Sequence, residues 1–144
     1  QEYGLIIGPQ LSETIKIELA SATISGKPHS YEVSGRDLIY GLPRVESIDS
    51  HEVTAAIAQV LQEIMYPVRT ALENIPPELA SDVIEKGIVM TGGGANLKML
   101  DRYVTEETGI PSHVADDPEL SVVRGVGVVL ENLELWKRSI IGKV

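Results

Sequence analysis

The chain has no cysteine, and this absence limits its chemistry. Without a thiol among its 144 residues, a disulfide framework and thiolate catalysis are both excluded. Proteins of the reducing cytoplasm fit this pattern, so a cytoplasmic location is expected.

Basic residues are also scarce. The 12 lysines and arginines are outnumbered by 21 aspartates and glutamates, which gives a formal charge of -9. Proteins that bind nucleic acid draw much of their affinity from clustered Lys and Arg side chains on phosphate groups, and the sequence shows no such cluster. We therefore expect no nucleic-acid partner.

Long hydrophobic runs are missing as well. The longest, such as 88–90 and 126–130, fall far short of the roughly 20 residues that a membrane-spanning helix needs. The chain opens with neither an initiator methionine nor a signal peptide, which is typical of the middle of a gene product. Without internal repeats or low-complexity segments, the sequence predicts a soluble protein long enough to bury one real core.

Apolar periodicity predicts a helix near the start of the chain. Leu11, Ile15 and Leu19 recur at helical spacing, which indicates a helix over 11–22. Ser12 is the residue expected to cap its N-terminus, because a serine hydroxyl can accept a hydrogen bond from a free backbone N–H of the first turn.

The next two segments differ in period. Residues 29–50 mix alternating apolar positions with glycines, which predicts a hairpin or meander of short strands. From Ser50, which is expected to cap it, an apolar stripe at three- and four-residue steps predicts a long helix that Pro67 should kink or interrupt. The stripe consists of Val53, Ile57, Val60, Leu61, Ile64, Met65, Val68 and Leu72.

The second half alternates between helix and strand. Proline at its start and Gly87 at its end frame a short helix, and Gly109 marks the end of a later one. Such alternation indicates an α/β layer with a partly parallel sheet. The expected order is a helix over 76–87, a strand over 88–91, a helix over 95–109, a strand over 110–115, a turn over 116–120 and a last helix over 121–140.

Three consecutive glycines, Gly92 to Gly94, follow the strand over 88–91 and run into a helical pattern. Glycine there lets the backbone approach a ligand, and the N–H groups of the first helical turn favour negative charge or polar oxygens. Tight packing between a strand and a helix also uses glycine, so the residues alone leave both explanations open. The run matches neither the P-loop nor the complete dinucleotide-binding pattern.

Three long segments resemble the MreB family of bacterial actins, in the C-terminal half of its members. They are LIIGPQLSETIKIELASA, VSGRDLIYGLPR and the stretch from PPELASDVIEKGIVMTGGGANLKML to SVVRGVG, and together they extend over almost the whole chain. The resemblance implies an actin-like ATPase fold, related to ribonuclease H, in a protein that forms cytoskeletal filaments and determines rod shape.

The resemblance also implies a division of the chain into parts of the four-subdomain actin layout. Residues 1–49 correspond to the small subdomain IIB, residues 50–119 to part of the large subdomain IIA, and residues 120–144 to a C-terminal helix that packs on subdomain IA. Its apolar face would be exposed without IA, so we expect it to fold back on the helices of 50–119 or to pair with another chain.

Nucleotide contacts of the family fall on two places in this sequence. The resemblance implies that these residues border the adenosine part of a bound ATP. Asn96 departs from the family pattern, in which leucine is usual at that position. The implied cofactor-binding residues are Glu13, Thr14, Ile15 and Lys16 in the first helix and Gly92, Gly93, Gly94, Ala95 and Asn96 in the glycine loop.

Glu13 and Lys16 illustrate how the resemblance changes an interpretation. They lie about one helical turn apart, and by spacing alone they are best explained as a solvated ion pair that stabilises the helix by about 0.3 kcal/mol. In a nucleotide site, Glu13 would accept hydrogen bonds from ribose hydroxyls and Lys16 would lie along the adenine or ribose. The resemblance favours the second interpretation.

The phosphate-binding hairpins of the actin superfamily do not occur in this sequence. The resemblance implies that they precede residue 1, together with the residues that position magnesium and the attacking water. We therefore expect ATP as the cofactor, with its magnesium held by the other half. No catalytic residue and no metal ligand is expected here, and the chain should not hydrolyse ATP by itself.

The remaining polar residues have structural explanations. His29, His51 and His113 lack metal-ligand spacing, and Asp116 with Asp117 is typical of a turn with a helix N-cap.

Self-association into head-to-tail filaments is the leading partner expectation, with the loops 26–30 and 41–45 as candidate surfaces. Other cell-shape or wall-synthesis proteins are expected partners. Lys137, Arg138 and Lys143 form a small basic tail that could touch an anionic membrane, although three charges are fewer than such contacts usually use. The alternatives are a kinase or chaperone ATPase of the actin, Hsp70 and sugar-kinase superfamily, or a stand-alone nucleotide-binding or protein-interaction module.

Overall fold

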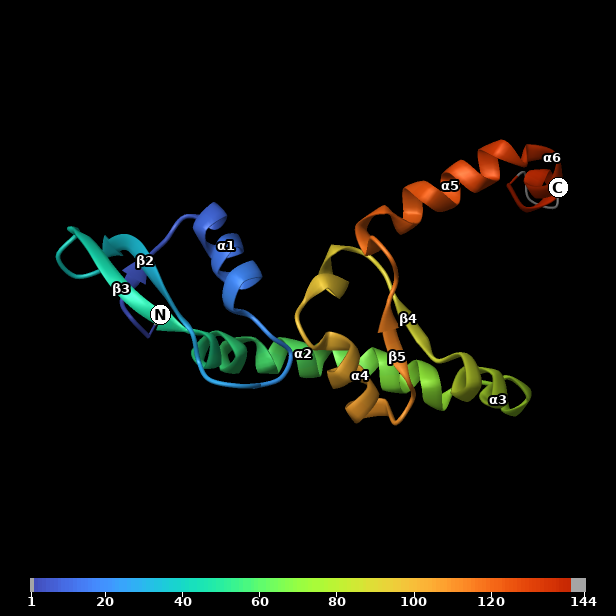
Figure 1. Cartoon of the computed structure of the whole chain (residues 1–144), viewed down its shortest axis with the longest axis horizontal. Helices are drawn as coiled ribbons and strands as arrows, with labels where there is room; N and C mark the ends of the chain where they lie inside the picture. Colours follow the sequence, from blue (N-terminus) through green and yellow to red (C-terminus); the bar gives the residue numbers. More distant parts are fainter. Residues whose placement is uncertain (1, 141–144) are drawn as a thin grey trace.

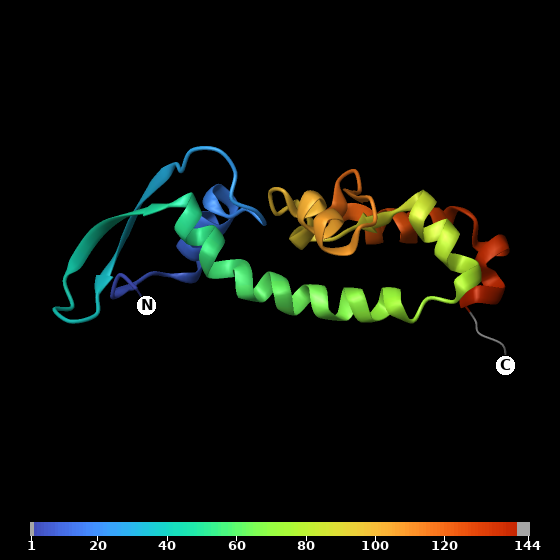
Figure 2. The same ribbon diagram turned by 90° about the horizontal axis from the view of Figure 1, so that it is seen from below.

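One long helix, α2 (Ser50–Glu73), runs along the molecule and joins two groups of elements (Figure 1). A computed structural model describes residues 2–140. We call residues 2–49 the N-terminal lobe and residues 74–140 the C-terminal lobe. Figure 2 shows the two lobes at either end of α2, on the same side of it. The predicted α/β architecture is confirmed.

The N-terminal lobe is a small antiparallel sheet covered by one helix. The predicted hairpin is confirmed, and the sheet has the strand order β1-β2-β3. Ile15 and Leu19 of the helix pack on Val33 of the central strand, and these three residues form the buried core of the lobe. Its elements are β1 (Leu5–Ile6), α1 (Pro9–Leu19), β2 (Ser30–Asp37) and β3 (Pro43–Asp49).

Helix α1 begins earlier than its sequence pattern predicts. Gly8 occupies the N-cap position and Pro9 lies in the first turn, so the prediction of Ser12 as the cap is wrong. Proline suits this place because its φ angle is preset for a helix and its missing N–H would have no partner there.

Helix α2 is capped by Asp49 rather than by Ser50. The Asp49 carboxylate accepts hydrogen bonds from the N–H groups of His51 and Glu52, and Glu52 Oε2 accepts one from Asp49 N at 2.9 Å. The result is a reciprocal capping box. Ser50, the predicted cap, is buried inside the first turn.

Pro67 was expected to kink or interrupt the long helix, and it does not interrupt α2. Residues 50–73 form a single helix with Pro67 inside it. Proline removes the hydrogen bond to the carbonyl of Glu63, but Pro67 and Glu63 are both exposed, so water can satisfy that carbonyl.

The C-terminal lobe holds a two-stranded parallel sheet, which confirms the predicted parallel pairing. Ile88, Val89 and Met90 pair with Ser112, His113 and Val114. The elements are α3 (Pro77–Lys86), β4 (Ile88–Met90), the 3-10 helix η1 (Gly93–Asn96), α4 (Leu100–Thr108), β5 (Ser112–Val114), the 3-10 helix η2 (Pro118–Leu120), α5 (Ser121–Glu131) and α6 (Leu133–Ile140).

The sequence suggested that the glycine run leads straight into a helix, but the structure shows that it does not. Gly93 to Asn96 form the tight turn of η1, and α4 begins only at Leu100. Met99, just before it, has a left-handed backbone with φ of 61°, which breaks the helical path. The predicted end of α4 is confirmed, because Gly109 occupies its C-cap position with a left-handed backbone.

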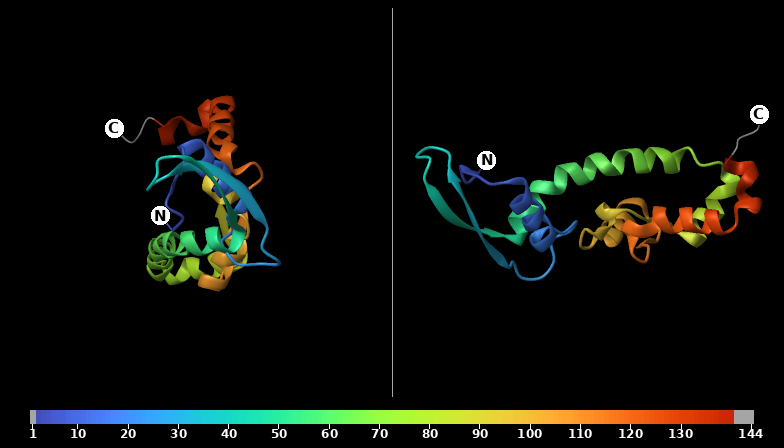
Figure 3. Two further views of the ribbon diagram at one scale, coloured as in Figure 1. Left: turned by 90° about the vertical axis from the view of Figure 1, so that its left-hand side faces the viewer. Right: turned by 90° about the horizontal axis from the view of Figure 1, so that it is seen from above.

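The last predicted helix is two helices separated by Asn132. The Asn132 side chain donates a hydrogen bond to the carbonyl of Val128 at 2.9 Å, and its backbone leaves helical geometry. Helix α5 does not fold back on the helices of 50–119, because Val122 is 77 % exposed and α5 contains no buried residue. Pairing of its apolar face with another chain, the other expected outcome, stays a prediction. Figure 3 gives two further views of the same arrangement. Lys143 and the Arg138 side chain, both named in the predicted basic tail, lie outside the described part.

Candidate functional site

A cavity of about 650 Å³ lies between the two lobes, against α2. Its volume is within the range of roughly 300–1,000 Å³ that small-molecule sites occupy. Four segments form its walls: α1, the middle of α2, the η1 loop with the residues that follow it, and η2. The lining residues are Glu13, Lys16, Ile17, Ala20, Ile57, Val60, Leu61, Ile64, Gly93, Gly94, Asn96, Leu97, Lys98 and Glu119.

The α1 wall carries an ion pair. Lys16 Nζ lies 2.7 Å from Glu13 Oε1, and both side chains are more than half exposed. An exposed pair of this kind contributes about 0–1 kcal/mol to stability. Both groups are therefore available to a ligand, because separating them costs little.

The wall formed by the η1 loop leaves open space beside its glycines. A Cβ atom added at Gly94 would meet nothing within 4 Å, and one at Gly93 would only approach Glu119. Asn96 Nδ2 donates a hydrogen bond to Glu119 Oε1 at 2.8 Å, and Gly92 N donates one to the carbonyl of Pro118 at 2.7 Å. These two bonds attach the loop to η2 and leave the glycine backbone facing open space.

The α2 wall is apolar. Val60 and Ile64 are 53 % and 52 % exposed and line the cavity beside the buried Leu61. Both residues belong to the apolar stripe that helical spacing predicted. In the structure this part of the stripe lines the cavity and is not packed in a protein core. A flat ring could lie on this surface.

Five of the nine predicted site residues line the cavity, and four do not. Ile15 points into the core of the N-terminal lobe, Ala95 is 5 % exposed, and neither lines the cavity. Thr14 Oγ1 donates a hydrogen bond to the carbonyl of Gln10 within α1, and Gly92 forms the turn with φ of 86°. The five that meet there are Glu13, Lys16, Gly93, Gly94 and Asn96.

Among the charged residues of this lining, sequence reasoning missed Lys98 and Glu119. Lys98 Nζ donates a hydrogen bond to the carbonyl of Glu18 at 2.5 Å, and its own carbonyl accepts one from Ala22 N at 2.8 Å. Lys98 thus attaches the loop wall to the end of α1, across about 80 residues of sequence. No local pattern signals such a contact.

Metal binding has no support in the described part of the chain. Among residues 2–140, no three histidine, aspartate or glutamate side chains gather where they could hold an ion. The same residues contain no helix that is long and apolar enough to cross a membrane.

The arrangement of lobes around this cavity is that of the C-terminal half of an actin-like protein. The crystal structure of MreB5 of Spiroplasma citri bound to ADP matches this chain with a TM-score of 0.88 and 30% sequence identity, over 99% of this chain and 42% of that one. The family model of the MreB/Mbl protein matches residues 1–138.

Two curated relatives agree with these matches. The cell shape-determining protein MreB of Escherichia coli K12 is 46% identical over 135 residues, which cover 94% of this chain and 39% of that protein. The cell shape-determining protein Mbl of Bacillus subtilis is 38% identical over 141 residues, which cover 97% of this chain and 42% of that protein. The chain belongs to the MreB/Mbl family of cell shape-determining proteins and spans about two fifths of the length of these relatives.

Proposed function

We propose that this chain supplies the adenosine side of the nucleotide cleft in a filament-forming ATPase that determines cell shape. The observation that carries the proposal is the meeting of Glu13 and Lys16 with Gly93 and Gly94 around one cavity. The S. citri relative was crystallised with ADP, which supports a nucleotide as the ligand.

Each wall of the cavity has a role in this proposal. The Glu13 carboxylate accepts hydrogen bonds from the ribose hydroxyls, and the Lys16 side chain lies along the adenine or ribose. The backbone at Gly93 and Gly94 admits the sugar and the α-phosphate, and the apolar surface of Val60 and Ile64 takes the face of the adenine ring.

The rest of the reaction belongs to residues outside this chain. Magnesium would supply the charge stabilisation that phosphoryl transfer needs. The described residues offer no group of ligands for it. The role of this chain is to hold and orient the nucleoside, so we expect no hydrolysis by the chain alone.

Filament assembly is the second part of the proposal. The β2–β3 turn exposes Ile39, Tyr40 and Leu42 at one end of the molecule, with exposed fractions of 82 %, 79 % and 65 %. The opposite end exposes Leu79 and Ile84 on α3. Two different surfaces at opposite ends suit a head-to-tail contact, which propagates without closing. Cytoplasmic filaments of this kind would act with other cell-shape or wall-synthesis proteins and could lie at the membrane.

The test of the nucleotide site is a titration of the 144-residue chain with ADP by calorimetry. Gly94→Val should lower the affinity at least tenfold, because the new side chain fills the space of the sugar while the ligand-free fold accommodates it. Gly127→Val is the matched control, since a Cβ there also meets nothing within 4 Å and α5 lies away from the cavity. Equal affinities of the two variants for ADP would contradict the placement of the ligand.

A charge substitution tests the contact with the ribose. Glu13→Gln should lower ADP affinity about tenfold, because a hydrogen bond to a carboxylate contributes about 1.5–3 kcal/mol. Glu85→Gln, on the exposed surface of α3, is the control and should leave the affinity unchanged.

The exposed valines of α5 favour a second function, a module that only binds other proteins. Val122, Val123 and Val126 are 77 %, 61 % and 51 % exposed, and apolar patches of this kind mark interaction sites. If the folded chain fails to bind ADP but associates in light scattering, this second function replaces the first.

A further inference from the structure

Asn96 and Glu119 are bonded to each other in the wall of the candidate nucleotide site. Asn96 Nδ2 donates a hydrogen bond to Glu119 Oε1 at 2.8 Å. Both residues are exposed and both line the cavity, so a ligand can reach them. The proposed roles of Glu13 and of the glycine backbone concern the sugar and the α-phosphate, and they leave this polar pair without a function.

Asn96 lies in a turn that its neighbours hold in place. Ala95 is buried, with 5 % of its surface exposed. The N–H groups of Ala95 and Leu97 donate hydrogen bonds to the carbonyls of Gly92 and Gly94 at 3.0 and 3.2 Å. The Asn96 amide is therefore presented to the cavity from a supported backbone, which a selective contact requires.

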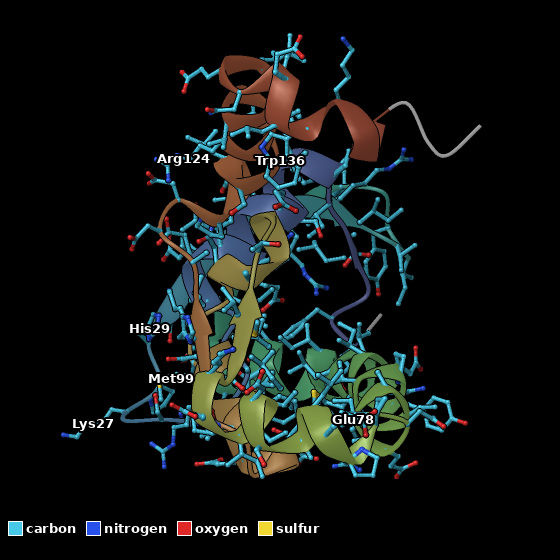
Figure 4. The ribbon with its side chains drawn as sticks, turned by 90° about the vertical axis from the view of Figure 1, so that its right-hand side faces the viewer. Lys27, His29, Glu78, Met99, Arg124 and Trp136 are labelled. Carbon is cyan, nitrogen blue, oxygen red and sulfur yellow. The ribbon has the colours of Figure 1, made fainter. Side chains whose placement is uncertain are left out.

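Glu119 is supported from the side of α5. Figure 4 shows Arg124 of α5 beside the loop that leads into this helix. Arg124 Nη1 donates a hydrogen bond to the carbonyl of Asp116 at 3.1 Å, and the guanidinium forms an ion pair with Asp117. Pro118, the residue before Glu119, is buried. The Glu119 carboxylate thus belongs to a second segment that is held in place.

The hydrogen bond between the two side chains fixes the orientation of the Asn96 amide. An ionised carboxylate only accepts hydrogen bonds, so the amide must turn its NH2 group, and not its oxygen, toward Glu119. This orientation leaves Asn96 Oδ1 as an acceptor and the second Nδ2 hydrogen as a donor for a ligand.

Adenine carries the matching groups. Its 6-amino group is a donor and the neighbouring ring nitrogen is an acceptor, and an asparagine amide can pair with both at once. A 6-oxopurine, such as hypoxanthine or guanine, has an acceptor in place of the amino group and would face Asn96 Oδ1 with like polarity. It would fit only if the amide turned over, which would place Oδ1 against the Glu119 carboxylate.

We propose that Asn96 recognises the 6-amino group of adenine and that Glu119, as a positioning residue, makes this recognition selective by fixing the Asn96 amide. The inference rests on the proposed nucleotide site and names what selects its base. The Glu119 carboxylate would repel a phosphate, so the uncharged base is the part of the nucleotide that suits this side of the cavity. The apolar surface of Val60 and Ile64 in the same cavity takes the face of the base while Asn96 contacts its edge.

ADP and inosine diphosphate test the proposal, because their bases differ in the 6-amino and 6-oxo groups. In calorimetric titrations of the 144-residue chain, ADP should bind about tenfold more tightly than inosine diphosphate. Asn96→Leu should bring this ratio close to one, because ADP loses its contact and inosine diphosphate has none to lose. Asn132→Leu is the matched control, since that side chain also donates one hydrogen bond, to the carbonyl of Val128, and lies outside the cavity.

Glu119→Gln tests the positioning role. Glutamine can donate as well as accept, so the Asn96 amide becomes free to turn over toward a 6-oxo group. Loss of the negative charge would strengthen the binding of both diphosphates equally, so the ratio of the two affinities is the measure. We expect inosine diphosphate to gain about threefold relative to ADP, a change that a merely structural role of Glu119 would not produce. Glu85→Gln, on the exposed surface of α3, is the control and should keep the wild-type ratio.

Equal affinities of the wild-type chain for ADP and inosine diphosphate would overturn this proposal and leave the nucleotide site standing. A ratio in Asn96→Leu equal to that in Asn132→Leu would overturn the role of Asn96, and a ratio in Glu119→Gln equal to that in Glu85→Gln would overturn the role of Glu119. If the folded wild-type chain binds neither nucleotide, the proposed nucleotide site itself is wrong and this inference fails with it. The two failures are therefore distinguishable.

Discussion

The two lobes of this protein bury their apolar residues to different extents. In the N-terminal lobe, Leu19 and Val33 are 2 % and 0 % exposed, because α1 lies on the sheet. In the C-terminal lobe the parallel strands β4 and β5 are only partly covered, and Val89 in the middle of β4 is 55 % exposed. Parallel sheets occur almost always with both faces covered by helices. The first lobe carries its own core, and the second offers surface that a further structural layer would cover.

The difference in burial between the two lobes should appear most clearly when one apolar side chain is removed from each. Leu19→Ala should lower the free energy of unfolding by about 3 kcal/mol, because it leaves a cavity under α1. Leu130→Ala on α5, where the leucine is 59 % exposed, should change it by less than about 0.5 kcal/mol. Urea unfolding followed by circular dichroism measures both. Equal losses would show that α5 has a buried partner in solution.

A pair of glycines tests how tightly the C-terminal lobe is packed. Gly87 and Gly109 both have positive φ, but a Cβ at Gly87 would lie 2.3 Å from the carbonyl oxygen of Pro111, whereas one at Gly109 would meet nothing within 4 Å. Gly109→Ala should therefore cost about 1 kcal/mol of stability for its backbone alone. Gly87→Ala should cost about 2 kcal/mol, because the entry to β4 must also shift. Thermal unfolding compares them, and similar melting temperatures would contradict close packing at β4.

Acid should weaken a specific turn of the N-terminal lobe. The pKa of Asp37 lies below its ordinary value. The largest cause is the hydrogen bond from Tyr40 N, followed by the one from Ile39 N, and the guanidinium of Arg44 lowers the pKa further. Because the pKa is lower in the folded state, the stabilisation is complete above the unfolded pKa of about 3.9 and is lost as the pH falls through the folded value.

Asp37→Asn should consequently be less stable than the wild type at neutral pH, and the difference should shrink below about pH 4. Urea midpoints measured across this range check the expectation. Asp82→Asn, at an exposed i, i+4 pair with Lys86, should show little difference at any pH. A constant gap between Asp37→Asn and the wild type would exclude the carboxylate as its source.

Local sequence signals predicted most elements of both lobes. The hairpin over 29–50, the strand over 88–91 and the glycine ends of α3 and α4 were predictable, because period and backbone freedom are local properties. The cap of α2 was placed one residue too late, since Asp49 and Glu52 form a reciprocal pair that outcompetes Ser50.

The candidate site was predictable only in part. The resemblance pointed to α1 and the glycine loop, but Ile15 and Ala95 proved to be packing residues of the same segments. Lys98 and Glu119 act across long sequence separations, through contacts with Glu18 and Asn96. Such contacts depend on how the lobes fold together, and a single sequence contains no local record of that.

Helix α2 fixes the spacing of the two lobes. Its 24 residues extend over about 36 Å at 1.5 Å per residue, and both lobes that border the cavity are attached to this one helix. A second connection, the bridge between Ser21 and Lys98, joins the lobes directly. Any change in the width of the cavity would therefore have to bend the helix or disturb that bridge.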